Sequence, residues 1–279
     1  SIEIVAIFKD SPADKAGLKP GDKIIKVNNK DVSGMELDDV VKLIKNKKKV
    51  NIIVKRDNKE KEITLKQNTV VIPSVSSRIV ESNNKKVGVL NVSIFAANTY
   101  KQFKNKLDDL ENKKIDSLII DVRQNSGGHL DQVSKILSLF MKQDKVIYQI
   151  KTKKGVEKYY STGKKSKNYN VVVLIDNGSA SASEILAAAM NESYGATLMG
   201  EKTYGKGTVQ KEYMLSSGAS IKYTVEKWFT PKGKSINGKG ISPTIEVALS
   251  DEYANNPTDE NDNQLQEAIK FLTEEKKTN

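Results

Sequence analysis

The chain has 279 residues, of which 37% are hydrophobic and 29% are charged, enough for one large domain or two unequal domains with buried cores. It contains no cysteine and a single histidine, His129, which excludes disulfides and thiol catalysis and leaves a zinc site without its usual ligands. No apolar run is long enough to span a membrane, and the first residues lack the pattern of a signal segment, so we expect the chain to start inside a domain.

Lysine supplies most of the positive charge, and the net charge at pH 7 is +11. Basic runs such as residues 45–49 can attract nucleic acid or anionic lipid. Acidic residues are interleaved along the chain, however, and no aromatic residues interrupt the basic runs to stack on bases. We therefore expect a solvated, lysine-rich surface and no nucleic-acid partner.

Residues 3–67 have the pattern of a small domain made of short strands and one longer helix. Apolar alternation predicts strands at 4–8, 23–29, 50–56 and 61–66, the last two forming a hairpin around Asp57 and Asn58. Helical spacing predicts a helix at 36–46, and turn-forming residues after the first strand predict a one-turn helix at 12–16. A polar connector at 67–84, with one strand-like piece at 70–75, marks the expected domain boundary.

From residue 86 the pattern changes to alternating strands and helices. Strands are predicted at 87–95, 116–123, 170–176 and 196–202, and helices at 99–113, 130–141 and 182–193. Hairpins at 145–161 and 209–229 and an amphipathic helix at 263–275 complete the pattern. Near-continuous apolar strands that alternate with helices predict an α/β domain around a buried sheet.

Two loops follow the carboxyl ends of predicted strands, where open α/β sheets carry their sites. The first, residues 123–129, contains Gly128, whose backbone N–H can face a ligand without obstruction by a side chain. The second, residues 176–181, leads into a helix whose positive end favours a developing oxyanion. The loop contains Ser179 and Ser181, and Ser183 follows at the start of the helix. Taken alone, each loop is explained equally well as a turn or a helix cap.

A third feature favours chemistry. Lys206 stands between Gly205 and Gly207 in a predicted bend between strands, and glycines in such a place indicate close approach of the backbone to another element. Burial disfavours the charged ammonium form of a lysine. An enclosed lysine can therefore take the proton of a serine, as in the Ser–Lys variant of the catalytic triad.

Four segments together resemble the carboxyl-terminal processing protease family, also called the tail-specific proteases. They are DVRQNSGG (121–128), SASASE (179–184), YGKGTVQ (204–210) and GKGISPTIEV (238–247), in the order of the family. Residues 11–32, SPADKAGLKPGDKIIKVNNKDV, resemble the PDZ domain that this family carries. The resemblance implies a PDZ domain at 1–67 that lacks its first loop and strand, a crotonase-like protease core at 68–250 and a C-terminal helical segment at 251–279.

The resemblance also implies a role for individual residues. Ser181 matches the nucleophile, Lys206 the general base, and Gln210 the glutamine that orients the lysine in bacterial members. The backbone N–H groups of Gly128 and Ala182 match the oxyanion hole. No metal and no organic cofactor is implied.

Three alternatives stay open from the residues alone. A Ser–His hydrolase would use His129, although the G-x-S-x-G elbow is absent around Ser181 and a solvent-facing helix start explains His129 more simply. An acyl-CoA enzyme of the crotonase type would leave the PDZ-like module unused. A non-catalytic PDZ scaffold would be favoured if Ser181 or Lys206 were replaced, and neither is.

The other polar residues of these motifs are expected to be structural. Ser179 and Ser183 should support the turn and the helix start. Asp121 and Arg123 stand at a strand end where they could contact a substrate backbone, but we expect them to pair and brace the loop.

These observations predict a serine endopeptidase that cuts proteins near the C-terminus, with a PDZ domain that recruits or gates the substrate tail. The expected partners are proteins or peptides with a free C-terminal tail, and a homodimer is compatible with the sequence. The expected location is extracytoplasmic, either secreted or anchored on the outer side of the cytoplasmic membrane by a tether outside this chain.

Overall fold

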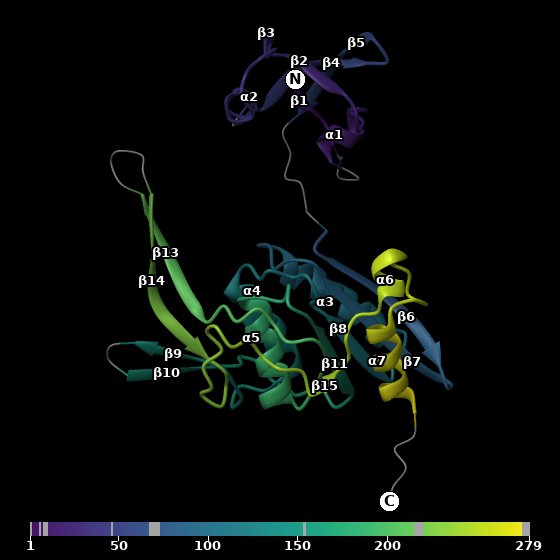
Figure 1. The fold of residues 1–279 in the computed structure, drawn as a ribbon, viewed down its shortest axis with the longest axis vertical. Coiled ribbons are helices and arrows are strands. Elements are labelled where there is room, and N and C mark those ends of the chain that lie inside the picture. Colours follow the sequence, from purple (N-terminus) through teal and green to yellow (C-terminus); the bar gives the residue numbers. More distant parts are fainter. Residues whose placement is uncertain are drawn as a thin grey trace, which may run out of the picture. The chain divides into compact units, whose positions relative to one another are not determined.

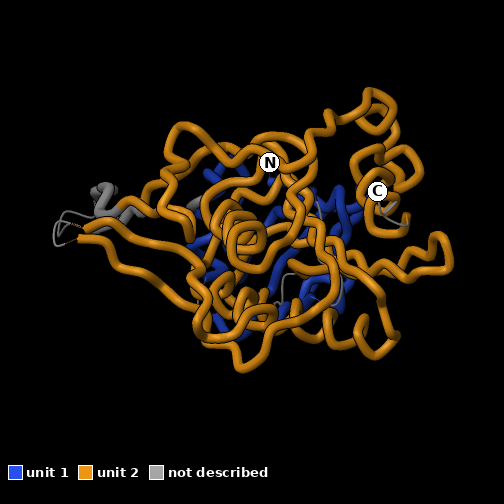
Figure 2. Tube along the Cα trace, turned by 90° about the horizontal axis from the view of Figure 1, so that it is seen from below, with its two compact units in different colours: residues 1–72 blue, residues 73–279 orange. Residues whose placement is uncertain are grey.

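The computed structural model describes residues 2–5, 7, 11–45, 47–66, 73–152, 155–214 and 220–274, and for residues 38 and 209–226 the description is limited to the backbone. The chain divides into two compact units, Ser1–Ile72 and Pro73–Asn279 (Figures 1 and 2).

The first unit is a small antiparallel sheet with two helices. Its strands follow the order β1 (Ile2–Glu3), β2 (Lys23–Val27), β4 (Lys49–Arg56) and β5 (Lys59–Lys66), and β3 (Lys30–Asp31) pairs with β2. The helices are α1 (Pro12–Lys15) and α2 (Leu37–Ile44). Apolar side chains from the strands and from α2, among them Val27, Val40, Ile52 and Val54, form the core of this unit.

Most of the elements predicted for this unit are confirmed. The hairpin turns at Asp57 and Asn58, whose φ angles of 50° and 59° suit a tight two-residue connection. The one-turn helix is present as α1, with the Ser11 side chain accepting a hydrogen bond from the Asp14 N–H. The strand predicted at 4–8 is wrong in its bounds, because the described strand is β1, at Ile2–Glu3.

A six-stranded sheet forms the centre of the second unit. Its order is β15 (Ile245–Glu246), β12 (Thr197–Gly200), β11 (Asn170–Ile175), β8 (Ser117–Asp121), β7 (Lys85–Val92) and β6 (Val75–Ser82). All neighbours are parallel except β6, which pairs with β7 in antiparallel fashion. The predicted α/β domain around a buried sheet is thereby confirmed.

Helices cover both faces of this sheet. Side chains of α3 (Thr99–Asn112), α4 (Leu130–Phe140) and α5 (Ala182–Ala189) share one core, and those of α7 (Asn263–Thr273) share the other. Strand β8 shows the alternation: Leu118 and Ile120 join the first core and Ile119 the second. Helix α5 continues as the π-helix η1 (Met190–Tyr194).

The two predicted hairpins pair to form a second, antiparallel sheet. Its order is β10 (Gly155–Tyr160), β9 (Val146–Thr152), β14 (Ser220–Phe229) and β13 (Thr208–Met214). The Lys206 segment therefore lies in the connection between β12 of the central sheet and β13 of this second sheet.

The connector predicted at 67–84 is wrong in part, because residues 75–82 form the edge strand β6. A tight turn at Asn83 and Asn84, with φ angles of 50° and 59°, joins β6 to β7. The terminal segment from residue 251 holds the short helix α6 (Asp251–Asn255) and α7, and α7 packs on the central sheet. Residues 67–72 lie outside the description.

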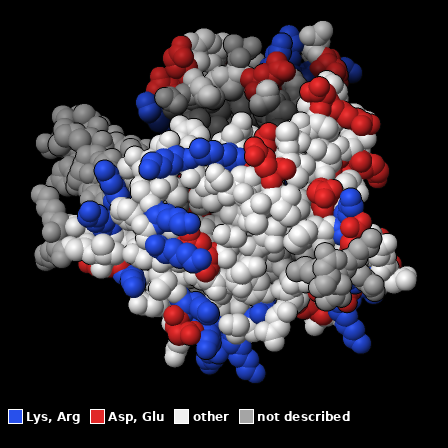
Figure 3. Space-filling model, turned by 60° about the horizontal axis from the view of Figure 1, so that its bottom comes forward, with Lys and Arg blue, Asp and Glu red and all other residues white. Residues whose placement is uncertain are grey.

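The surface carries both signs of charge. On the face drawn in Figure 3, basic side chains form several separate groups with acidic side chains beside them. This distribution is what a solvated, lysine-rich surface predicts. In the described part of the chain, no helix is long and apolar enough to cross a membrane.

The packing of α7 on the sheet predicts a large loss of stability for Leu265→Ala. Leu265 is 1% exposed in the α7 core, so truncation should lower the free energy of unfolding by about 2–5 kcal/mol. Lys270→Ala, at an exposed position of the same helix, is the control and should change it by less than about 0.5 kcal/mol. Urea unfolding followed by the fluorescence of buried Trp228 measures both, and equal losses would contradict the assignment.

Candidate active site

The loops that follow β8 and β11 are packed directly against each other. The Ala180 N–H and the Ser183 hydroxyl both donate to the Asn125 carbonyl, at 3.0 and 2.7 Å. A Cβ placed on Gly127 would lie only 2.9 Å from the Cβ of Ser181, so the absence of a side chain lets the loops meet. The structure therefore brings together the two loops that the sequence singled out.

Ser181 differs from its two neighbouring serines in conformation and access. It is the N-cap of α5 with φ 55° and ψ −115°, a conformation that residues other than glycine rarely adopt, and it is partly exposed. Backbone strain of this kind is concentrated at functional sites. Ser181 is therefore the one serine of the run that a substrate can reach.

Ser179 and Ser183 are fully buried and use their hydroxyls within the fold. The Ser179 hydroxyl donates to the Val122 carbonyl at 2.8 Å, and the Ser183 hydroxyl donates to the Asn125 carbonyl. Both bonds join the α5 loop to the loop after β8. The predicted structural role of these two serines is confirmed.

Ala182 is the first residue of α5, directly after Ser181, and Gly128 follows Gly127, which packs against Ser181, two residues before α4 begins at Leu130. The Gly127–His129 backbone runs along Phe95, with the Phe95 N–H donating to the Gly127 carbonyl and the His129 N–H donating to the Phe95 carbonyl. Among the described residues, neither the Gly128 N–H nor the Ala182 N–H donates to a protein acceptor. Two free backbone N–H groups, one of them at the start of α5, can together stabilise a developing negative charge.

Lys206 is held by its backbone on both sides. Its N–H donates to Oε2 of Glu184 at 2.8 Å, and its carbonyl accepts from the Trp228 indole at 3.0 Å. The side chain is half-buried, and within the described residues no carboxylate forms an ion pair with it.

The glycines that flank Lys206 pack against the backbone of residues 236–240. A Cβ on Gly205 would lie 2.8 Å from the Gly240 nitrogen, and a Cβ on Gly207 would lie 2.7 Å from the Asn237 nitrogen. The prediction that these glycines mark a close backbone approach is confirmed.

One carboxylate links Ser181 to Lys206. Oε2 of Glu184 accepts the N–H of Ser181 at 2.9 Å and the N–H of Lys206 at 2.8 Å, so the two backbone nitrogens face the same oxygen. Sequence analysis missed Glu184, although the spacing Ser181-x-x-Glu184 is that of a helix capping box. The capping box accounts for one of these bonds but gives no sign of the second, to Lys206.

Gln210 and His129 complete the predicted set. Gln210 lies in β13, opposite Thr224, and its side chain is outside the description, so its orienting role stays a prediction. His129 is the exposed N-cap of α4, the helix-start position expected for a structural residue. No cluster of three or more acidic or histidine side chains among the described residues is arranged to hold a metal ion.

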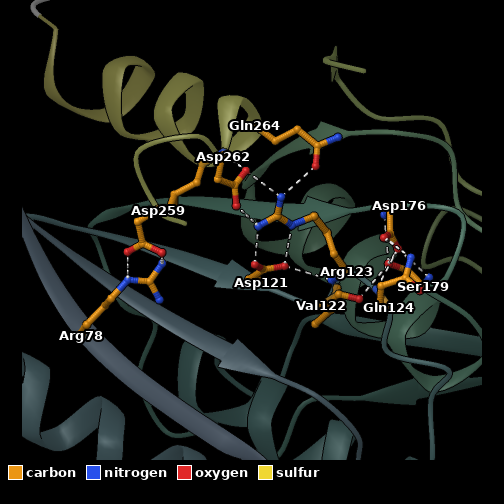
Figure 4. Close-up of polar contacts among 11 residues, drawn as sticks. Arg78, Asp121, Val122, Arg123, Gln124, Asp176, Ser179, Asp259, Asp262 and Gln264 are labelled. Atoms are coloured by element: carbon orange, nitrogen blue, oxygen red, sulfur yellow. Dashed lines mark hydrogen bonds and ion pairs between the residues drawn. The ribbon is translucent and has the colours of Figure 1, made fainter. Parts of the chain in front are cut away.

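Arg123 forms a buried network at the carboxyl ends of the strands (Figure 4). Its guanidinium contacts Asp121 at 2.7 Å and Asp262 at 2.6 Å, and it donates to Gln264 at 2.9 Å. Burial alone would lower the pKa of Arg123, but the hydrogen bonds to Asp262 and Asp121 outweigh it and raise the pKa above its usual value. The predicted pairing with Asp121 is confirmed, whereas the link to α7 through Asp262 was not predicted.

A second polar cluster in Figure 4 fixes the Ser179 turn. The Asp176 carboxylate accepts the N–H groups of Gln124 and Ser179 at 2.9 and 3.0 Å, and it accepts the Gln124 side-chain amide at 2.7 Å. The loops after β8 and β11 are thus joined from this side as well.

Comparison with known proteins gives consistent matches. A model of peptidase family S41 matches residues 86–247, and a PDZ domain model matches residues 3–56. Over 274 residues the chain is 39% identical to the carboxy-terminal processing protease CtpB of Bacillus subtilis (strain 168). The aligned region covers 96% of this chain and 56% of that protein. The chain spans about half the length of the curated relatives it matches.

Two solved structures share the fold. The photosystem II D1 C-terminal processing protease has a TM-score of 0.58 at 26% identity, covering 88% of this chain and 68% of that chain. A putative S41 protease from Bacteroides fragilis has a TM-score of 0.63 at 19% identity, covering 98% of this chain and 79% of that chain. Because the family model spans more than half of the chain and includes both Ser181 and Lys206, the chain belongs to peptidase family S41.

Proposed function

We propose that this protein is a serine endopeptidase that cleaves protein substrates near the C-terminus, with Ser181 as nucleophile and Lys206 as general base. The observation that carries the proposal is the link through Glu184, which bonds the backbone of the accessible serine and that of the half-buried lysine. The name of the Bacillus subtilis relative, carboxy-terminal processing protease, supports the choice of substrate end.

In the first step, the neutral amine of Lys206 accepts the proton of the Ser181 hydroxyl while the oxygen attacks the scissile carbonyl carbon. The tetrahedral oxyanion is stabilised by the N–H groups of Gly128 and Ala182. The Lys206 ammonium then gives its proton to the leaving amine as the C–N bond breaks. The products are a free amine and an ester between the substrate acyl group and Ser181.

In the second step, Lys206 takes a proton from a water molecule, and the resulting hydroxide attacks the ester carbonyl. The same two N–H groups hold the second oxyanion. Proton return from Lys206 to the serine oxygen releases the carboxylic acid and restores the enzyme. Gln210 is proposed to orient the lysine amine through both steps.

The first unit is proposed to supply substrate and takes no part in the chemistry. Residues 3–56 match a PDZ domain, and PDZ domains bind peptides by adding a strand to a sheet edge. A unit of this kind can recruit or gate a free C-terminal tail. We further propose a crotonase-like core, since paired backbone N–H groups serve as its oxyanion hole, and an extracytoplasmic location.

Ser181→Ala should lower the cleavage rate of an unfolded protein substrate at least about 1,000-fold, because it removes the nucleophile. Ser179→Ala and Ser183→Ala are matched controls that remove hydroxyls two residues away. They should retain cleavage while losing about 1–3 kcal/mol of stability, since each leaves a buried carbonyl with one partner fewer. Mass spectrometry of the fragments measures all three, and full activity of folded Ser181→Ala would refute the assignment.

Lys206→Arg should be inactive although the positive charge is kept, because arginine does not give up its proton in proteins. Lys202→Arg makes the same change at an exposed position four residues earlier and should leave the rate unaltered. Turnover that survives Lys206→Arg but is lost in His129→Ala would instead establish the Ser–His alternative.

Gly127→Ala should lower kcat about 100-fold by pushing the loop after β8, which carries the Gly128 N–H, away from Ser181. The new Cβ would meet the Ala180 carbonyl at 2.8 Å and the Ser181 Cβ at 2.9 Å, and small displacements at a reacting centre cost about this much. Gly155→Ala is the control, because Gly155 also has a positive φ, 133°, but has no atom within 4 Å of its Cβ position. Equal effects of the two changes on kcat would show that backbone strain alone is responsible.

A further inference from the structure

Glu184 is a buried acidic residue that the two proposed steps do not use. Glu184 is the third residue of α5 and is 0% exposed. Among the described residues, no cationic side chain forms an ion pair with it. An acidic side chain in such a place is costly unless hydrogen bonds replace the lost water. Its presence beside the nucleophile therefore calls for an explanation.

The Glu184 carboxylate accepts four hydrogen bonds. Oε2 accepts the N–H groups of Ser181 and Lys206, at 2.9 and 2.8 Å. Oε1 accepts the Thr203 hydroxyl at 2.6 Å and the Gly205 N–H at 2.8 Å. Two carboxylate oxygens offer about four lone-pair positions, so this carboxylate is saturated by neutral donors.

Capping of α5 explains only one of these bonds. The Ser181 N–H is the usual target of a Glu at the third helical position. The other three donors belong to residues 203–206, the segment that carries the proposed base. Apart from the carboxylate, the Tyr204 N–H reaches the nucleophile loop, donating to the Ser179 carbonyl at 3.1 Å.

We propose that Glu184 is a positioning residue that fixes the Lys206 segment against the nucleophile, so that the amine stays within reach of the Ser181 hydroxyl. This inference rests on the proposed function, because it assigns the geometry of that same serine and lysine. The strained conformation of Ser181 is held by the same carboxylate through its N–H. One side chain thus sets the backbone of both partners.

Two substitutions grade the effect. Glu184→Gln keeps the size of the side chain but offers one acceptor oxygen and an amide that donates, so at most two of the four donors stay satisfied. Glu184→Ala removes all four bonds. Glu192→Gln is the matched control, because Glu192 lies further along the same helical segment and accepts the Lys232 N–H at 2.7 Å, in a different loop.

Hydrogen exchange measured by mass spectrometry tests the link without any turnover. In Glu184→Ala the amides of 203–207 should exchange at least about 10-fold faster, while 230–234 is unchanged. Glu192→Gln should leave the exchange of 203–207 unchanged. Unchanged protection of 203–207 in folded Glu184→Ala would overturn the inference, and Glu184→Gln provides the same measurement if the alanine variant does not fold.

Kinetics on an unfolded protein substrate test the consequence. We expect kcat to fall at least about 100-fold in Glu184→Ala and less in Glu184→Gln, with KM within about threefold, while Glu192→Gln retains kcat. A loss confined to KM, or an equal loss in Glu192→Gln, would overturn the positioning role. Ser181→Ala, measured alongside, separates the positioning role of Glu184 from the proposed function. Cleavage that is lost in Ser181→Ala but kept in Glu184→Ala would refute the positioning role alone. Absence of cleavage by the wild-type protein would refute the proposed function.

Discussion

The arrangement of this site depends on the hydrogen bonds that join the loop after β11 to the loop after β8. The hydroxyls of Ser179 and Ser183 donate to the carbonyls of Val122 and Asn125, and the Ala180 N–H donates to Asn125 as well. All three bonds are buried. Each joins two loops that are more than fifty residues apart in sequence. With them in place, the backbone of the proposed nucleophile has little freedom to move relative to the glycines after β8.

The parallel sheet makes this junction possible. In a parallel sheet, neighbouring strands end at the same edge, and β8 and β11 are direct neighbours with Ile119 opposite Val172. Both strands are buried on their two faces, so their register is fixed by two cores at once. Arg123 extends the same edge to α7 through Asp262, which ties the helix on the opposite face to the strand ends that carry the site.

The sequence predicted those features that depend on local pattern. Apolar periodicity located the strands and helices of the central sheet, and the glycines around Lys206 indicated a close approach that the structure confirms. Strand β6 was missed because an edge strand alternates weakly, and its signal was the turn at 83–84. The contact of Arg123 with Asp262 joins residues 139 positions apart, which no local pattern encodes.

Conflict between local preference and tertiary structure is concentrated at the proposed nucleophile. A serine with φ 55° is unfavourable by itself, and residues of this kind persist only where the surroundings determine them. Here the surroundings are the buried helix α5 on one side, which fixes the chain after Ser181, and the hydrogen bonds of Ser179 on the other. The orientation of the Ser181 peptide is fixed as well, because the Ser181 N–H donates to the Glu184 carboxylate. Strain at Ser181 is thus maintained by bonds on both sides, and Ser181 is the one partly exposed serine of a run whose other two hydroxyls donate to buried backbone carbonyls.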